Sequence, residues 1–126
     1  MLNKKRIAIL LGDPSGIGPE IVSKLLCEKI VDDANILVIG ERKILEDGEN
    51  ISGKKGNFKF VTNSKDVVFD DKTKFFLDIS KGTNRTYKYG QVSAESGASV
   101  LEAMDEAMDL ANNKKIDAVN FGPMNK

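Results

Sequence analysis

Histidine is absent from the 126 residues, cysteine occurs once, and basic and acidic side chains balance at nineteen each. Without histidine, any mechanism that needs an imidazole base or metal ligand must take it from another part of the protein or from another chain. The single cysteine, Cys27, cannot form an intrachain disulfide, which fits a reducing cytoplasm. Because it falls within an amphipathic helical pattern, we expect it to be a buried packing residue rather than a reactive thiol.

The charge balance and the short apolar runs exclude further classes of protein. With a formal net charge of zero, the sequence has no excess of positive charge that would attract nucleic acid or an anionic membrane surface. The basic N-terminal residues precede only five apolar ones, residues 7–11, which are too few for a signal peptide or a membrane span. A hydrophobic content of 40% is nevertheless enough for a folded core. We therefore expect a soluble cytoplasmic protein that binds neither nucleic acid nor membrane.

Continuous apolar runs alternate with helical patterns along the chain, which predicts an α/β fold with a mainly parallel sheet and flanking helices. Ile7–Leu11 and Asn35–Ile39 are typical of strands that are buried on both faces. The region from 41 to 72 is weaker, and there we expect a polar loop over 47–57. The expected strands are 7–11, 35–39, 58–61, 74–79 and 117–121, and the expected helices are 19–30, 42–45 and 93–112. No internal domain boundary is evident.

The longest expected helix begins at Ser93, a favourable N-cap residue, with Glu95 in its first turn. Its apolar side chains recur at helical spacing, so we expect Leu101, Met104 and Met108 to face the sheet or a partner helix. The residues on this stripe are Gly97, Leu101, Met104, Met108 and Ala111.

The segment LLGDPSGIGPEIV, residues 10–22, is the most unusual connection between a strand and a helix. A phosphate-binding P-loop would need a second glycine where Ile17 stands, and the dinucleotide fingerprint would need a third where Ile21 stands. Two interpretations remain open. The glycines could simply allow a tight connection. Alternatively, Asp13 and Ser15 could line a ligand site at the carboxyl end of the strand, together with the free N–H groups of the next helix.

A second glycine–proline loop, Gly122-Pro-Met-Asn-Lys126, follows the expected strand 117–121. Parallel strands end at the same edge of a sheet, so this loop should bring Asn125 and Lys126 to the edge that carries Asp13 and Ser15. The two loops together favour a shared ligand site over a purely structural turn.

Three motifs resemble the 4-hydroxythreonine-4-phosphate dehydrogenase family of vitamin B6 biosynthesis. The family pattern G-[DE]-P-[AS]-G-I-G-P-[DE] is matched by residues 12–20, and its G-x-[LV]-x-x-E-x-G pattern is matched by residues 90–97. Its [GA]-P-x-[HN]-K loop is matched by residues 122–126. The family is similar in fold to the isocitrate and isopropylmalate dehydrogenases, which hold the nicotinamide cofactor on a scaffold that is not a Rossmann fold. That similarity accounts for the missing third glycine.

The resemblance also implies roles for individual residues. Lys126 would be catalytic and, with Asn125, would bind the small phosphorylated substrate. The first turn would border NAD(P), and its cofactor-binding residues would be Gly12, Asp13, Ser15, Gly16, Ile17 and Gly18.

The implied reaction is NAD-dependent oxidation of 4-phosphooxy-threonine, followed by decarboxylation and assisted by a divalent metal. The family's histidine ligands and its G-H-T-E segment come after the last matched loop, and this sequence contains none of them. We therefore expect residues 1–126 to be the N-terminal segment of a larger two-domain, homodimeric dehydrogenase, inactive alone and without a metal site of its own. Two alternatives stay open: a dehydrogenase of threonate or erythronate 4-phosphate, and a non-catalytic half-cleft binding module.

Overall fold

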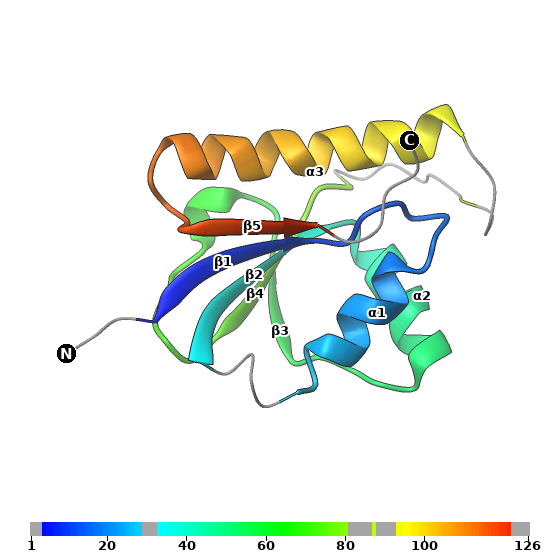
Figure 1. The fold of residues 1–126 in the computed structure, drawn as a ribbon, viewed down its shortest axis with the longest axis horizontal. Helices are drawn as coiled ribbons and strands as arrows, with labels where there is room; N and C mark the ends of the chain where they lie inside the picture. Colours follow the sequence, from blue (N-terminus) through cyan, green and yellow to red (C-terminus); the bar gives the residue numbers. More distant parts are fainter. Residues whose placement is uncertain (1–3, 29–32, 81–86, 88–92, 122–126) are drawn as a thin grey trace.

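The computed structural model describes residues 4–28, 33–80, 87 and 93–121. Within these residues, five parallel strands form one sheet in the order β3-β4-β2-β1-β5 (Figure 1). The strands are β1 Lys5–Leu10, β2 Ala34–Gly40, β3 Phe58–Val61, β4 Lys74–Asp78 and β5 Ala118–Phe121. The helices are α1 Gly18–Leu25, α2 Arg42–Ser52 and α3 Ala94–Asn112, with a short 3₁₀ helix η2 at Ser64–Asp66. The expected α/β fold with a parallel sheet is confirmed.

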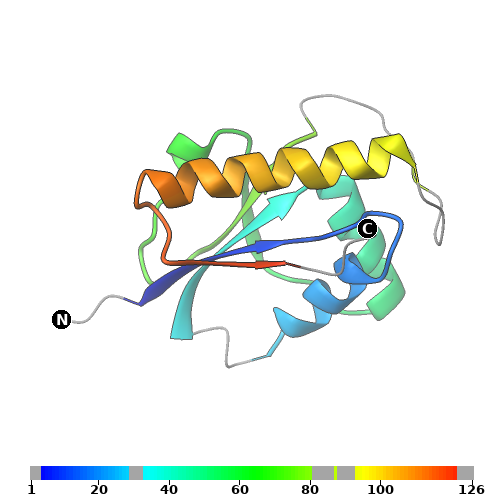
Figure 2. The ribbon, with the colours of Figure 1, turned by 45° about the horizontal axis from the view of Figure 1, so that its top comes forward.

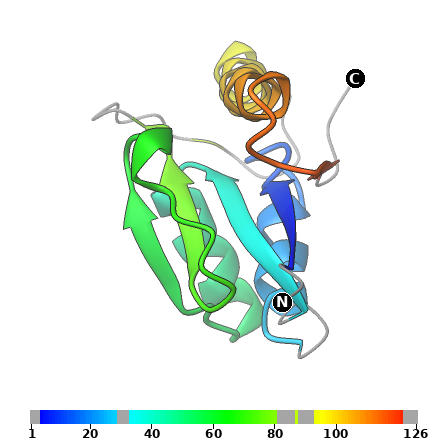
Figure 3. The ribbon, with the colours of Figure 1, turned by 90° about the vertical axis from the view of Figure 1, so that its left-hand side faces the viewer.

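The helices lie on both faces of the sheet. Helices α1 and α2 pack together on one face, and α3 runs across the other (Figures 1 and 3). Strand β4 lies between β2 and β3 although it follows β3 in the chain. From β2 the chain continues through α2, on one face of the sheet, to β3. After β4 it continues through α3, on the opposite face, to β5. In the part of the chain that the structure describes, no helix combines the length and the apolar character needed to cross a membrane.

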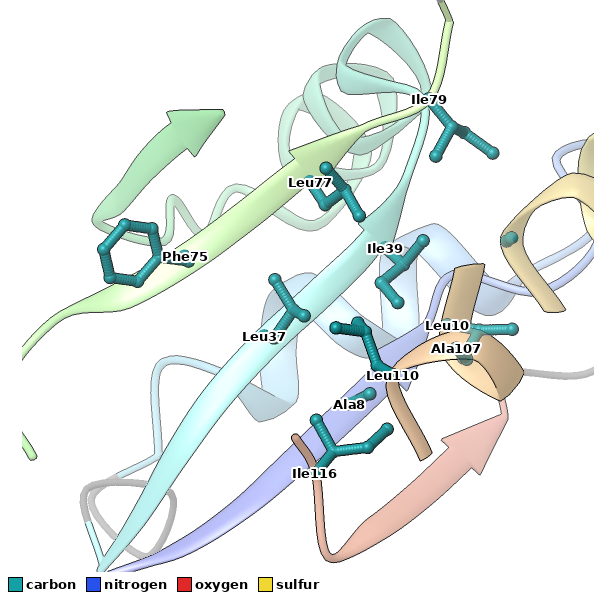
Figure 4. Close-up of a cluster of buried hydrophobic side chains, with 11 residues drawn as sticks. Ala8, Leu10, Leu37, Ile39, Phe75, Leu77, Ile79, Ala107, Leu110 and Ile116 are labelled. Atoms are coloured by element: carbon teal, nitrogen blue, oxygen red, sulfur yellow. The ribbon is translucent and has the colours of Figure 1, made fainter. Parts of the chain in front are cut away.

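The central strand β2 is buried on both sides, which explains its unbroken apolar run. Leu37 and Ile39 point to the α3 side, where they pack with Ala107 and Leu110 (Figure 4). Val38 belongs to a second cluster on the side of α1 and α2. Alternate residues of one strand thus supply both cores, because successive side chains of a strand point to opposite faces.

Helix α2 is longer than the sequence pattern indicates, and the polar loop expected over 47–57 is helical as far as Ser52. Gly48 lets this longer helix pack closely on α1, because a Cβ atom at that position would lie 2.6 Å from the carbonyl carbon of Pro19. The two helices can therefore approach closely only where a glycine stands. Gly53, with φ of 73°, then ends the helix in the left-handed region.

Helix α3 begins as expected, since the Ser93 hydroxyl accepts a hydrogen bond from the Ser96 amide at 3.1 Å. We expected Leu101 and Met108 to face the sheet or a partner helix, and the first alternative is wrong: these side chains are 62% and 51% exposed. Contact with a partner helix stays a prediction. Met104 is half-buried and does contact the core. The side of α3 on the sheet consists mainly of small residues, which let the helix lie close to the strands: Ser96, Ser99, Ala103, Ala107 and Leu110.

Cys27 is also placed differently from the expectation, because it is exposed. Helix α1 ends at Leu25, so Cys27 lies beyond the helix and outside its buried stripe. Its thiol lies 3.5 Å from the carbonyl oxygen of Lys55.

An ion pair fastens the start of β5 to β1. The Arg6 guanidinium donates to the Asp117 carboxylate at 3.1 Å through Nη2 and at 3.3 Å through Nε. The backbone amide of Arg6 donates to the same carboxylate at 2.8 Å, and the Asp117 amide donates back to the Arg6 carbonyl oxygen at 2.8 Å. The guanidinium and the Arg6 amide hold the pKa of Asp117 at about 2, below its ordinary value of 3.8. These contacts join the residue before β5 to β1, next to the ladder in which Ile7 is paired with Ala118.

The buried face of α3 can be tested by truncating one leucine on each side of the helix. Leu110→Ala should lower the free energy of unfolding by about 2–5 kcal/mol, because it opens a cavity against the sheet. Leu101→Ala, on the exposed side, should change it by no more than about 0.5 kcal/mol. Denaturant unfolding of both variants measures the difference, and equal losses would contradict this placement of the helix.

Candidate functional site

Strands β1 and β5 are parallel neighbours, so their carboxyl ends lie side by side at one edge of the sheet (Figure 2). Leu10 is paired with Phe121 in this register. The expectation that these two strands end at the same edge is therefore confirmed. Gly122 to Lys126, including the substrate-binding candidates Asn125 and Lys126, lie outside the described residues.

The turn after β1 folds around its own carboxylate. Gly12 has φ of 82°, a backbone conformation that residues with a side chain rarely adopt. The Asp13 carboxylate is buried and accepts a hydrogen bond from the Ser15 amide at 2.8 Å, and the Asp13 carbonyl oxygen accepts one from the Gly16 amide at 3.0 Å. Asp13 thus closes the turn internally rather than presenting its charge to solvent.

The remaining turn residues divide into a buried and an accessible group. Ser15 and Gly18 are buried, and no hydrogen-bond partner for the Ser15 hydroxyl is found in the described part of the chain. Gly12 and Gly16 are half-buried, and Ile17 is 59% exposed. Ile17 is the N-cap of α1 and carries no polar side-chain atom, so the backbone itself forms the start of the helix. Backbone amides at a helix start can bind an anion.

A second group of polar residues lies at the ends of β2 and β4. These strands are neighbours, but β2 continues into α2 on one face and β4 continues toward α3 on the other. Such a reversal leaves a crevice outside the strand ends, which is where open α/β sheets bind ligands. Glu41 is the first residue after β2 and is only 5% exposed. Its Oε2 atom accepts hydrogen bonds from the Ser99 hydroxyl at 2.7 Å and from the Tyr87 hydroxyl at 2.5 Å.

A small cavity joins this group to the first turn. Its volume is about 10 Å³, close to the space that one water molecule needs. The lining residues come from the turn, the end of β2, the start of α2 and the sheet side of α3: Leu11, Gly12, Pro14, Ile39, Gly40, Glu41, Ile44, Ser99 and Ala103. Sequence reasoning missed Glu41 and Ser99. The available signal was the charged residue directly after the buried run of β2, at the edge where ligands bind.

Residues capable of holding a metal do not gather in the described part of the chain. No group of three or more histidine, cysteine, aspartate or glutamate side chains is close enough there to hold an ion. The arrangement at the sheet edge is instead a closed glycine turn with accessible backbone, next to a buried carboxylate and two hydroxyl groups. Such an arrangement can hold a polar ligand by its backbone, but it supplies no metal ligands.

The comparison with protein families decides the relationship. The family model described as pyridoxal phosphate biosynthetic protein PdxA matches residues 32–126. The chain belongs to the PdxA family. The matched region includes β2, Glu41, α3 and β5, so the group at the β2 end lies within the PdxA part of the chain.

Individual PdxA relatives extend the match to nearly the whole chain. A Pasteurella multocida protein provisionally named 4-hydroxythreonine-4-phosphate dehydrogenase is 34% identical over 128 residues, covering 99% of this chain and 38% of the relative. A Fusobacterium nucleatum protein provisionally named D-threonate 4-phosphate dehydrogenase is 32% identical, covering 98% and 37%. The crystal structure of a 4-hydroxythreonine-4-phosphate dehydrogenase from Burkholderia phymatum superposes with a TM-score of 0.81 at 31% identity, covering 98% and 38%. The chain thus spans about 38% of the length of such relatives.

The backbone of the turn can be tested at Gly12. Gly12→Ala should lower the free energy of unfolding by about 1–2 kcal/mol, because a Cβ atom is strained at positive φ. Gly97→Ala is the matched control: Gly97 lies in α3, and a Cβ atom there would have no atom within 4 Å. That control should gain up to about 1 kcal/mol from better helix propensity. If both variants lose stability equally by denaturant unfolding, the turn does not need the glycine conformation.

Proposed function

We propose that the complete protein is an NAD-dependent dehydrogenase of a phosphorylated four-carbon substrate, and that residues 1–126 form the N-terminal part of its two-domain fold. Membership of the PdxA family carries this proposal. The parallel sheet supports it further, because its edge unites the turn after β1 with the end of β5, from which the Asn125–Lys126 loop continues. A non-catalytic binding module is less well supported, since the relatives described above are named as dehydrogenases.

The first candidate substrate is 4-hydroxythreonine 4-phosphate, which is oxidised and decarboxylated. The names of the Pasteurella multocida relative and of the Burkholderia phymatum structure support it. The second is D-threonate 4-phosphate, supported by provisional names of relatives from Fusobacterium nucleatum and Halalkalibacterium halodurans, at 32% and 35% identity. Both are phosphorylated four-carbon acids with a secondary alcohol, so the same chemistry serves either of them.

The geometry of the turn fits a nucleotide that approaches backbone rather than side chains. In this proposal NAD(P) accepts the hydride from the alcohol carbon of the substrate. Gly12, Gly16, Ile17 and Gly18 border the cofactor, since glycines let a ligand come close to the amides. Asp13 and Ser15 support the turn from within, because both side chains are buried and the Asp13 carboxylate already binds the Ser15 amide.

Lys126 and Asn125 are proposed to bind the substrate on the other side of the cleft. A lysine ammonium at that position can pair with a carboxylate or a phosphate of the substrate, or donate a hydrogen bond to the alcohol oxygen. No group of metal-ligating side chains is found among the described residues, so in this proposal any divalent metal is held by residues outside them. The proposal includes a homodimer in the cytoplasm. The exposed Leu101 and Met108 leave an apolar side of α3 that a second copy or another part of the protein would cover.

The activity can be tested with the complete protein and a matrix of two nucleotides and two substrates. NAD⁺ and NADP⁺ are each offered with 4-hydroxythreonine 4-phosphate and with D-threonate 4-phosphate, and nucleotide reduction is followed by absorbance. We expect reduction of NAD⁺ with one of the two phosphates and little with its dephosphorylated form. Absence of reduction in all four combinations, with divalent metal supplied, would refute the proposed activity.

The role of Lys126 makes a separate prediction. In the complete enzyme, Lys126→Ala should lower kcat/KM at least about tenfold, which corresponds to ~1.4 kcal/mol of lost transition-state stabilisation. The melting temperature should hardly change, because the proposal assigns Lys126 to substrate binding rather than to the folded core. Lys115→Ala is the control: Lys115 is exposed and precedes β5, at the opposite edge of the sheet. Unchanged kinetics with a large loss of stability in Lys126→Ala would mean that the lysine only supports its loop.

A further inference from the structure

The carboxylate of Glu41 is buried but does not cap α2, the helix that begins at the next residue. Glu41 is the N-cap residue of α2, yet its side chain makes no capping hydrogen bond. The Arg42 amide, at the start of α2, instead donates to the Asp78 carboxylate at 3.3 Å. The Glu41 side chain points elsewhere, toward the hydroxyl groups of Ser99 and Tyr87. Burying a carboxylate is costly unless hydrogen bonds compensate, so this position requires both donors.

The two donors come from different segments of the chain. Ser99 lies in α3 on the opposite face of the sheet from α2, and Tyr87 belongs to the connection between β4 and α3. One carboxylate oxygen, Oε2, accepts both hydrogen bonds. Hydroxyl hydrogen bonds to a charged acceptor are shorter and stronger than neutral ones. Glu41 therefore joins the end of β2 to α3 and to the segment before it.

This junction lies directly beside the glycine turn. Glu41 and Ser99 line the same small cavity as Gly12 and Pro14 of the turn. Ser99 is also part of the closely packed small-residue face by which α3 sits on the sheet. A shift of α3 would therefore change the surface against which the turn rests.

We propose that Glu41 is a positioning residue for the nucleotide side of the cleft: through Ser99 and Tyr87 it holds α3 against the sheet edge and thereby fixes the turn at Gly12. The identity of the ligand rests on the proposed function, whereas the tether itself does not. Glu41 acts through the turn and does not touch the reacting atoms.

The charge on Glu41 can be removed with little change of shape by Glu41→Gln. The amide oxygen can still accept a hydrogen bond, but a neutral acceptor binds the two hydroxyls less strongly. The matched control is Glu49→Gln. Glu49 is also buried, at 7% exposure, and its carboxylate accepts one hydrogen bond, from the Gly56 amide at 2.7 Å. It lies later in α2 and does not line the cavity beside the turn.

The test uses the complete protein and two readouts. The first is hydrogen–deuterium exchange of peptides that cover residues 11–18 and 94–103. The second is the KM for the nucleotide, measured separately from kcat. Glu41→Gln should speed exchange in both peptides and raise the nucleotide KM by about five- to tenfold, with kcat within about twofold. Glu49→Gln should leave both readouts at their wild-type values, even if its melting temperature falls.

The two readouts can also disagree, and each such result decides one part of the proposal. Faster exchange with an unchanged nucleotide KM would make the tether purely structural and overturn the positioning role, as would unchanged exchange near the turn. If Glu41→Gln does not fold, Ser99→Ala and Tyr87→Phe each remove one donor and should give smaller changes in the same direction. A wild-type protein that reduces no nucleotide would overturn the proposed function alone. Exchange of residues 11–18 in the two glutamine variants would still decide whether Glu41 holds the turn.

Discussion

The parallel pairing of β1 with β2 on one side and with β5 on the other is the constraint on which the rest of the structure depends. Because all five strands run in the same direction, their carboxyl ends all lie at one edge of the sheet. The pairing with β5 is fixed at its start by Arg6 and Asp117, far from that edge. The same pairing brings the carboxyl end of β5 beside the turn after β1 at the other end of the sheet.

At that edge the polar groups are arranged to hold the backbone in place. Asp13 closes the glycine turn, Asp78 binds the start of α2, and Glu41 binds α3 and Tyr87. These three carboxylates follow or end three adjacent strands, and each is occupied by hydrogen-bond donors of the protein itself. The accessible surface of the turn is therefore mainly backbone and Ile17. This arrangement differs from the P-loop and from the usual dinucleotide fingerprint, neither of which the sequence matches.

The two faces of the sheet differ in how their helices pack. Helix α1 meets α2 through Gly48, where backbone approaches backbone, whereas α3 meets the sheet through serine and alanine. In both places small residues set the distance, and larger apolar residues such as Leu101 remain outside. Leu101 and Met108 lie on the exposed side of α3, whereas Met104 of the same stripe packs against the core.

The sequence by itself determined the fold class, the strands, the Ser93 cap and the glycine turn, because apolar runs, capping residues and positive-φ glycines act locally. The motifs also predicted the family. Tertiary structure decided the extent of α2, the buried side of α3, the exposure of Cys27 and the role of Glu41. The packing of α2 and the role of Glu41 depend on contacts between segments far apart in the chain, Gly48 with Pro19 and Glu41 with Ser99. Hydrophobic periodicity cannot reveal such contacts, since the residues that make them, such as Gly48 and Glu41, are not apolar.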